Sequence, residues 1–275
     1  MLSKIRTVLV HNSHPGNIGA SARALKNMGL SQLFLVAPKE FPAKEAEARA
    51  SNAQDILANT KVFATLEEAL VGCTWVLGCS ARQRRLSLPL YTAREAAEEI
   101  KQNLIGSLHN EFSGEIAILY GNEQHGLSNE ELAMCAAQIV IPTAEEYASL
   151  NLAQAVQIIS YELFLSLSQS QDNKDINVKN NKENLKLKEN AKTKNSTISQ
   201  TGFPDVNLHE MPNYESLAEF YRELEKMLIN IQYLDPKNPG QMMVRLKHLY
   251  ARAKLDKTEL TLLRGMLTAI QNERK

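Results

Sequence analysis

Three polar segments hold most of the residues that could carry out chemistry, and each lies between a short apolar run and a helical pattern. They span residues 12–23, 120–128 and 141–151. All three contain few ionisable side chains, and the first two contain glycines that let a main chain approach a ligand closely. Main-chain contacts of this kind are better suited to binding a nucleoside-like ligand than to general acid–base hydrolysis.

Other chemistries lack their usual sequence patterns. Gly16-x-x-Gly19 is not the Gly-x-Gly-x-x-Gly fingerprint of dinucleotide binding, and no acidic residue follows at the distance needed to hold a ribose. The sequence also lacks a phosphate-binding P-loop, a Ser-His-Asp order and a metal-ligand cluster. We therefore expect no metal, and a nucleotide-dependent oxidoreductase is disfavoured.

The elements that must position these segments follow from the apolar pattern. Buried strands are predicted at 7–10, 33–36, 62–63, 75–79, 116–120 and 138–141. Helices are predicted at 20–29, 44–57, 66–70, 92–103, 128–135 and 151–168. This alternation predicts an α/β fold with a mainly parallel sheet covered on both faces. Ligands of such folds bind where strands end and helices begin, which is where the three polar segments lie.

Composition excludes few functions but indicates the cellular compartment. The 275 residues carry 31 basic and 31 acidic side chains, so any nucleic-acid contact must be local. Cys73, Cys79 and Cys135 have no metal or disulfide spacing and are typical of a reducing compartment. With no apolar run near the ~18 residues that a membrane span needs and no signal-peptide pattern, we expect a cytoplasmic protein without membrane contact.

The rest of the chain is organised differently. Residues 169–213 are rich in asparagine and lysine and poor in apolar residues, so they are predicted to be a flexible linker. Three amphipathic helices are predicted in 214–275. The second of them carries Arg245, Lys247 and Arg252, a basic set that could bind phosphates or could be an ordinary solvated surface.

Three spaced motifs match a known family. The sequences at 17–24, 120–128 and 141–152, in that order, resemble the motifs of the SPOUT RNA 2′-O-ribose methyltransferases. The resemblance covers 1–168, which we take as a methyltransferase domain. Residues 214–275, a small all-helical C-terminal domain, resemble the extension of one subgroup, bacterial enzymes that modify tRNA at the first nucleotide of the anticodon loop. The resemblance implies a parallel-sheet SPOUT fold with a C-terminal trefoil knot, a homodimer, a tRNA substrate and S-adenosylmethionine as cofactor.

The resemblance also implies site residues, matched by position. Its cofactor contacts are Cys79, Ser80, Ala81, Gly121, Ile141, Ala148, Ser149 and Leu150. Its catalytic arginine is Arg23, with Asn17, Glu123, Ser149 and Asn151 as helpers. A guanidinium with a pKa above ~12 is a poor base, so we expect Arg23 to hold a phosphate and stabilise a developing 2′-oxyanion. The basic residues Arg82, Arg84 and Arg85 follow a cofactor segment and are expected to contact RNA, as are Arg245, Lys247 and Arg252.

Two alternatives stay open within this resemblance. The same chemistry could act on ribosomal RNA or at another tRNA site, or the fold could serve a catalytically silent RNA-binding protein. Asn122 stands where the subgroup often has arginine, but other SPOUT ribose methyltransferases share asparagine there, so the chemistry is not in question.

Overall fold

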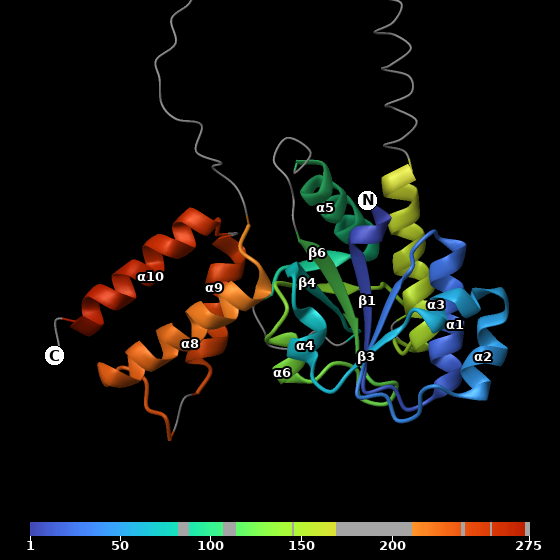
Figure 1. Cartoon of the computed structure of the whole chain (residues 1–275), viewed down its shortest axis with the longest axis horizontal. Coiled ribbons are helices and arrows are strands. Elements are labelled where there is room, and N and C mark those ends of the chain that lie inside the picture. Colours follow the sequence, from blue (N-terminus) through green and yellow to red (C-terminus); the bar gives the residue numbers. More distant parts are fainter. Residues whose placement is uncertain are drawn as a thin grey trace, which may run out of the picture.

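The computed structural model describes residues 1–81, 88–106, 114–144, 146–168, 211–237, 240–253 and 255–272. A sheet lies at the centre of the N-terminal part, and three helices stand beside it at one end (Figure 1). Residues 169–210 of the predicted linker 169–213 lie outside the described residues, as do the predicted RNA contacts Arg82, Arg84 and Arg85.

The seven strands form one sheet in the order β3-β2-β1-β6-β4-β7-β5. Their bounds are β1 Ile5–Val10, β2 Gln32–Val36, β3 Lys61–Phe63, β4 Cys73–Cys79, β5 Leu90–Thr92, β6 Glu115–Tyr120 and β7 Ala137–Val140. Every neighbouring pair is parallel, which confirms the predicted sheet type. The carboxyl ends of all seven strands therefore lie at one edge of the sheet, which is where ligands of such sheets bind.

Helices cover both faces of this sheet. The elements are α1 Pro15–Asn27, α2 Lys44–Ala50, α3 Gln54–Ala58, α4 Leu66–Leu70, α5 Ala93–Gly106, α6 Asn129–Leu132 and a helix over 152–168. Alternate strand residues point to opposite faces. Thus Leu9 packs in one core with α1, α2, α5 and the 152–168 helix, whereas Val8 and Val10 pack in another with α4 and α6.

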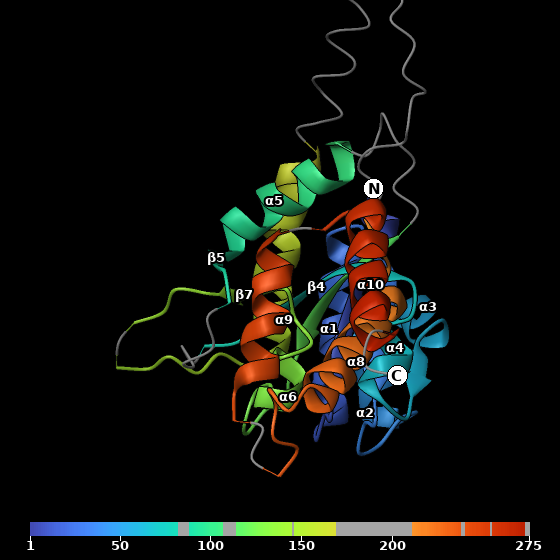
Figure 2. The same cartoon turned by 90° about the vertical axis from the view of Figure 1, so that its left-hand side faces the viewer.

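The C-terminal helices form a unit with its own core. They are α8 Tyr214–Asn230, α9 Met242–Ala253 and α10 Lys257–Asn272, packed around Phe220, Leu224 and Leu260. Seen from the side, this unit stands against the sheet (Figure 2). Tyr214 packs on the second core of the sheet, and both carboxylate oxygens of Glu215 accept the backbone N–H of Gly72 at 3.2 Å.

Four sequence predictions about elements need correction. The predicted helix 44–57 is broken, because Ser51 has φ of 53° between α2 and α3. Strand β5 was not predicted, since this three-residue edge strand has no apolar run. Helix α1 begins at Pro15 rather than at residue 20, because the fixed φ of proline suits the first helical position. Helix α6 ends at Leu132, three residues before the predicted end.

Candidate active site

The first two polar segments are joined by hydrogen bonds. The side-chain amide of Asn122 donates to the backbone carbonyl of His11 at 2.6 Å. Ser13 donates twice to Oε2 of Glu123, from its backbone N–H at 2.9 Å and from its hydroxyl at 2.7 Å. These contacts hold the loop after β1 against the loop after β6, as expected for strands that are neighbours in the sheet.

The third segment joins through two asparagines. Nδ2 of Asn17 donates to Oε1 of Glu123 at 2.9 Å, and Nδ2 of Asn151 donates to Oδ1 of Asn17 at 3.0 Å. Asn151 also caps the 152–168 helix, because its Oδ1 accepts the N–H of Ala153 at 2.9 Å. Three of the predicted catalytic residues, Asn151, Asn17 and Glu123, are therefore connected by hydrogen bonds in one relay.

Glu123 is the acceptor at the end of this relay. Partial burial acts to raise the pKa of Glu123, but the hydrogen bonds donated by Asn17 and Ser13 outweigh it and lower the pKa to about 2. The group is a carboxylate at neutral pH and a very weak base. It can orient donors, but it is poorly suited to accept a proton in a reaction.

Arg23 lies two turns beyond Asn17 on α1, and it is exposed. Arg23, Leu150, Asn151 and Gln154 are among the residues that line a groove of about 600 Å³ between α1 and the 152–168 helix. The predicted catalytic arginine and Asn151 thus line the same groove. Ser149 is exposed and directly precedes Leu150 in the sequence.

The predicted cofactor residues fall into two groups. Cys79, Gly121 and Ile141 follow or end the adjacent strands β4, β6 and β7, and Ser80 donates its N–H to Ile139 at 3.0 Å. The close packing at Gly121 leaves no room for a side chain, since a Cβ there would lie 2.1 Å from the backbone of Gly126.

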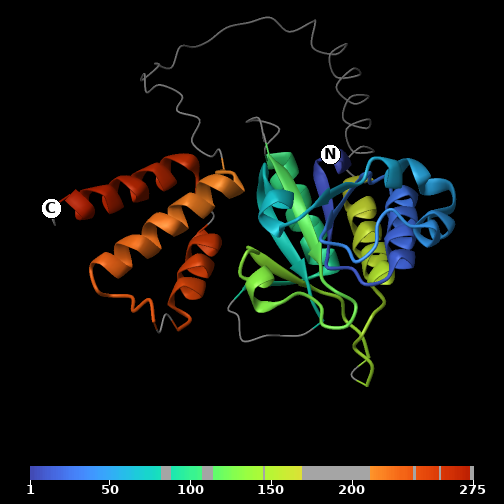
Figure 3. The same ribbon diagram turned by 60° about the horizontal axis from the view of Figure 1, so that its bottom comes forward.

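The second group lies on a loop that projects from the sheet edge (Figure 3). Ala148 and Ser149 are on the exposed part of this loop, whereas Leu150 is half-buried against α1. Ala81 is exposed just after β4.

The predicted RNA contacts on α9 do not share one face. Arg245 and Arg252 are exposed and lie seven residues apart, so they point the same way after two turns. Lys247 is half-buried, and its ammonium lies 5.8 Å from the ring centre of Tyr221. Within the described residues, this leaves two arginines on the outer face of the helix.

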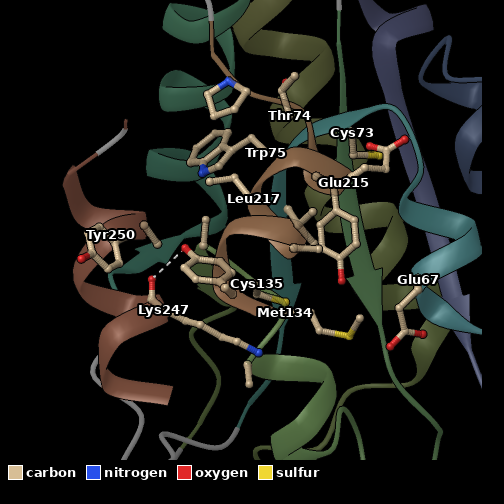
Figure 4. A pocket seen from close by; sticks show the side chains of 18 of the residues that line it. Glu67, Cys73, Thr74, Trp75, Met134, Cys135, Glu215, Leu217, Lys247 and Tyr250 are labelled. Carbon is tan, nitrogen blue, oxygen red and sulfur yellow. Dashed lines mark hydrogen bonds between the residues drawn. The ribbon is translucent and has the colours of Figure 1, made fainter. Parts of the chain in front are cut away.

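A cavity of about 1260 Å³ lies between the C-terminal helices and the sheet. Trp75, Met134, Tyr250 and Lys247 surround it (Figure 4). Its walls are largely apolar, and none of the predicted catalytic or cofactor residues lines it. It is therefore separate from the site at the strand ends.

Ser13 and Asn122 were not among the predicted site residues. Each acts through a partner about 110 residues away in the sequence. A polar residue in a polar loop gives no periodic signal, so only the pairing of β1 with β6 identifies these two contacts.

The fold agrees with the comparisons with known proteins. Residues 4–161 match the SpoU rRNA Methylase family, and residues 215–275 match the C-terminal domain of the tRNA methyltransferase TrmJ. The chain belongs to the SpoU rRNA methylase family and is a methyltransferase.

Individual relatives extend over nearly the whole chain. The tRNA (cytidine/uridine/adenosine-2′-O-)-methyltransferase TrmJ of Pseudomonas aeruginosa is 44% identical over 98% of this chain and 95% of its own length. The tRNA (cytidine/uridine-2′-O-)-methyltransferase TrmJ of Cronobacter sakazakii is 38% identical over 100% of this chain and 98% of its own. The crystal structure of TrmJ from Z. mobilis has a TM-score of 0.73 at 27% identity, covering 97% of this chain and 98% of that one.

Proposed function

We propose that this chain transfers a methyl group from S-adenosylmethionine to a ribose 2′-hydroxyl in tRNA. The proposed target is cytidine or uridine at the first nucleotide of the anticodon loop. The observation that carries the proposal is the groove where Arg23 lies beside Asn151, whose amide is fixed by the relay to Glu123. The names of the relatives from P. aeruginosa and C. sakazakii support the substrate and the bond.

The residues at the strand ends fit S-adenosylmethionine. The loop backbone at Ala81 and Gly121, with the apolar side chain of Ile141, suits an adenosine body that needs hydrogen bonds without a counter-charge. The main-chain N–H and carbonyl of Ser80 already pair with Ile139 and Gln138. When bound, the cofactor supplies an electrophilic methyl group on a sulfonium sulfur. A ligand at the ends of β4, β6 and β7 would lie at the same sheet edge as the relay.

The protein's contribution to the reaction is positioning and electrostatics. The 2′-oxygen would take the methyl group that the bound cofactor supplies, and its hydroxyl proton would leave to solvent. The exposed guanidinium of Arg23 can hold the adjacent phosphate and stabilise negative charge on the 2′-oxygen. Glu123 is too weak a base to take the proton, so its role is to orient Asn17 and Asn151.

We also propose that the C-terminal part of the sheet domain forms a trefoil knot and that two copies form a homodimer. The outer face of the 152–168 helix supports the dimer, because Tyr161 is 47% exposed and Phe164 is 39% exposed. Apolar side chains of this size on one helix face are typical of an interface. That helix also borders the groove of Arg23, so a second copy would lie close to the reaction site.

tRNA would contact the chain beyond the groove. The exposed arginines Arg245 and Arg252 on α9 are suited to phosphates. Arg82, Arg84 and Arg85 follow the cofactor residues in sequence, and we expect them to contact RNA as well. A tRNA substrate would place the reaction in the cytoplasm.

The test is tritium transfer from labelled S-adenosylmethionine to unmodified total tRNA, followed by nucleoside mapping. We expect label in 2′-O-methylcytidine or 2′-O-methyluridine at the start of the anticodon loop. Label at another site, or only in ribosomal RNA offered in parallel, would keep the chemistry and overturn the substrate. If the chain binds S-adenosylmethionine but labels no RNA, the catalytic role is refuted and a silent RNA-binding protein is the better account.

A further inference from the structure

Ser13 holds one carboxylate oxygen of Glu123 with two donors. Its backbone N–H and its hydroxyl both donate to Oε2, at 2.9 and 2.7 Å, and the residues are 110 positions apart. The N-cap of helix α1 is His14, which makes no side-chain cap bond. The hydroxyl of Ser13, one residue earlier, donates to the carboxylate.

The carboxylate fixes the direction of the whole relay. A carboxylate only accepts, so Asn17 must turn Nδ2 toward Oε1, which leaves its Oδ1 to accept from Asn151. Asn151 then keeps its own Oδ1 for the N–H of Ala153. Reversing either amide would bring two oxygens together, so both amide orientations follow from the position of Glu123.

We propose that Ser13 is a positioning residue for the methyl-transfer site, acting through Glu123 and Asn17 on Asn151. Without its hydroxyl, Oε2 keeps one bond, from the Ser13 N–H, and Oε1 keeps its bond from Asn17 and a long one, at 3.4 Å, from the His14 N–H. The carboxylate is then held less firmly, so Oε1 orients Asn17, and through it the amide of Asn151, less well. The kinetic consequence rests on the proposed function, whereas the coupling of Ser13 to Asn151 does not.

The experiment compares Ser13→Ala, Ser13→Thr, Asn151→Ala and the double variant Ser13→Ala/Asn151→Ala. The control is Thr65→Ala, which removes a hydroxyl that accepts the backbone N–H of Glu68 in the capping box of α4. For each protein we would measure kcat, the KM for S-adenosylmethionine and the free energy of unfolding.

We expect Ser13→Ala to lower kcat about tenfold, the effect of one hydrogen bond to a charged group, with little change in KM. Ser13→Thr keeps a hydroxyl and should recover most of the loss. The double variant should be no slower than Asn151→Ala, because both changes break the same relay. Thr65→Ala should lower stability and leave kcat as it is.

Two results would overturn the proposal while leaving the proposed function intact. One is a wild-type kcat for Ser13→Ala, and the other is a double variant whose loss is the product of the two single losses. If the wild-type chain methylates no RNA, the proposed function fails. The wild type, the two single variants and the double variant are then compared by their free energies of unfolding. Non-additive values for Ser13→Ala and Asn151→Ala would then uphold the relay, and additive values would refute it.

Discussion

Replacing Gly19 by alanine should separate two helices that the site depends on. Gly19 lies on the buried face of α1 against α2. A Cβ at this position would lie 2.0 Å from the backbone oxygen of Ala46 and 2.8 Å from its carbonyl carbon. Because backbone atoms cannot turn aside as a side chain can, the helices must move apart by roughly 1 Å to reach ordinary contact.

The magnitude follows from two opposing effects. Overpacking of a well-packed contact costs about 1–3 kcal/mol, and a clash with backbone belongs at the upper end. Alanine gains about 1 kcal/mol over glycine in a helix interior. We therefore expect Gly19→Ala to lose about 2 kcal/mol in the free energy of unfolding, or a Tm about 4–8 °C lower for a domain of this size.

Gly265 provides the matched control in α10. A Cβ there meets no atom within 4 Å, so Gly265→Ala should gain about 1 kcal/mol from helix propensity alone. Thermal unfolding of both variants would be followed by circular dichroism. A Gly19→Ala protein as stable as wild type would refute the reasoning, because the close approach of α1 to α2 would then not constrain the fold.

The site gives three more predictions. Arg23→Ala should retain binding of S-adenosylmethionine, measured by calorimetry, and lose about 10²–10³-fold in turnover of labelled tRNA; unchanged turnover would exclude a catalytic role. The folded-state pKa of Glu123, about 2, lies below its ordinary value of 4.5, so the carboxylate stabilises the fold above pH 4.5 and this contribution fades as the pH falls toward 2. Unfolding of wild type and Glu123→Gln should therefore differ most near neutral pH and converge in acid, and a gap independent of pH would contradict the assignment. The double variant Arg245→Ala/Arg252→Ala should weaken tRNA binding and reduce the slope of log K against log salt concentration by about 1.5. Nitrocellulose filter binding can measure this slope, and an unchanged slope would contradict the prediction.

Much of the fold could be predicted from the sequence because its strands are buried on both faces. All six residues of β1 are buried, and its last three, Val8, Leu9 and Val10, give a short apolar run. Strand β5 gives no such signal, since Leu90 is 44% exposed at the sheet edge and the strand depends on pairing with β7. The break at Ser51 is equally hidden, because the alanine and glutamate residues around it favour a continuous helix.

The residues predicted for the site lie near one another to different degrees. Arg23, Asn17, Glu123 and Asn151 come together because their loops leave strands at one edge of the sheet or meet beside α1. Ser13 escaped prediction, since its role depends on a contact with a loop 110 residues away. The placement of Lys247 against Tyr221 was also hidden, because a helix sequence does not say which face a second unit will cover.

The position of β1 in the sheet has a consequence for synthesis of the chain on the ribosome. β1 pairs with β2 on one side, but its other edge can pair with β6 only later, and the partly buried ion pair of Arg6 with Glu115 joins residues 109 positions apart. At about 5–20 residues per second, a nascent chain would expose this apolar edge for roughly 5–20 s before its partner emerges. This inner strand of the finished enzyme is thus, during translation, a segment that a chaperone would have to protect.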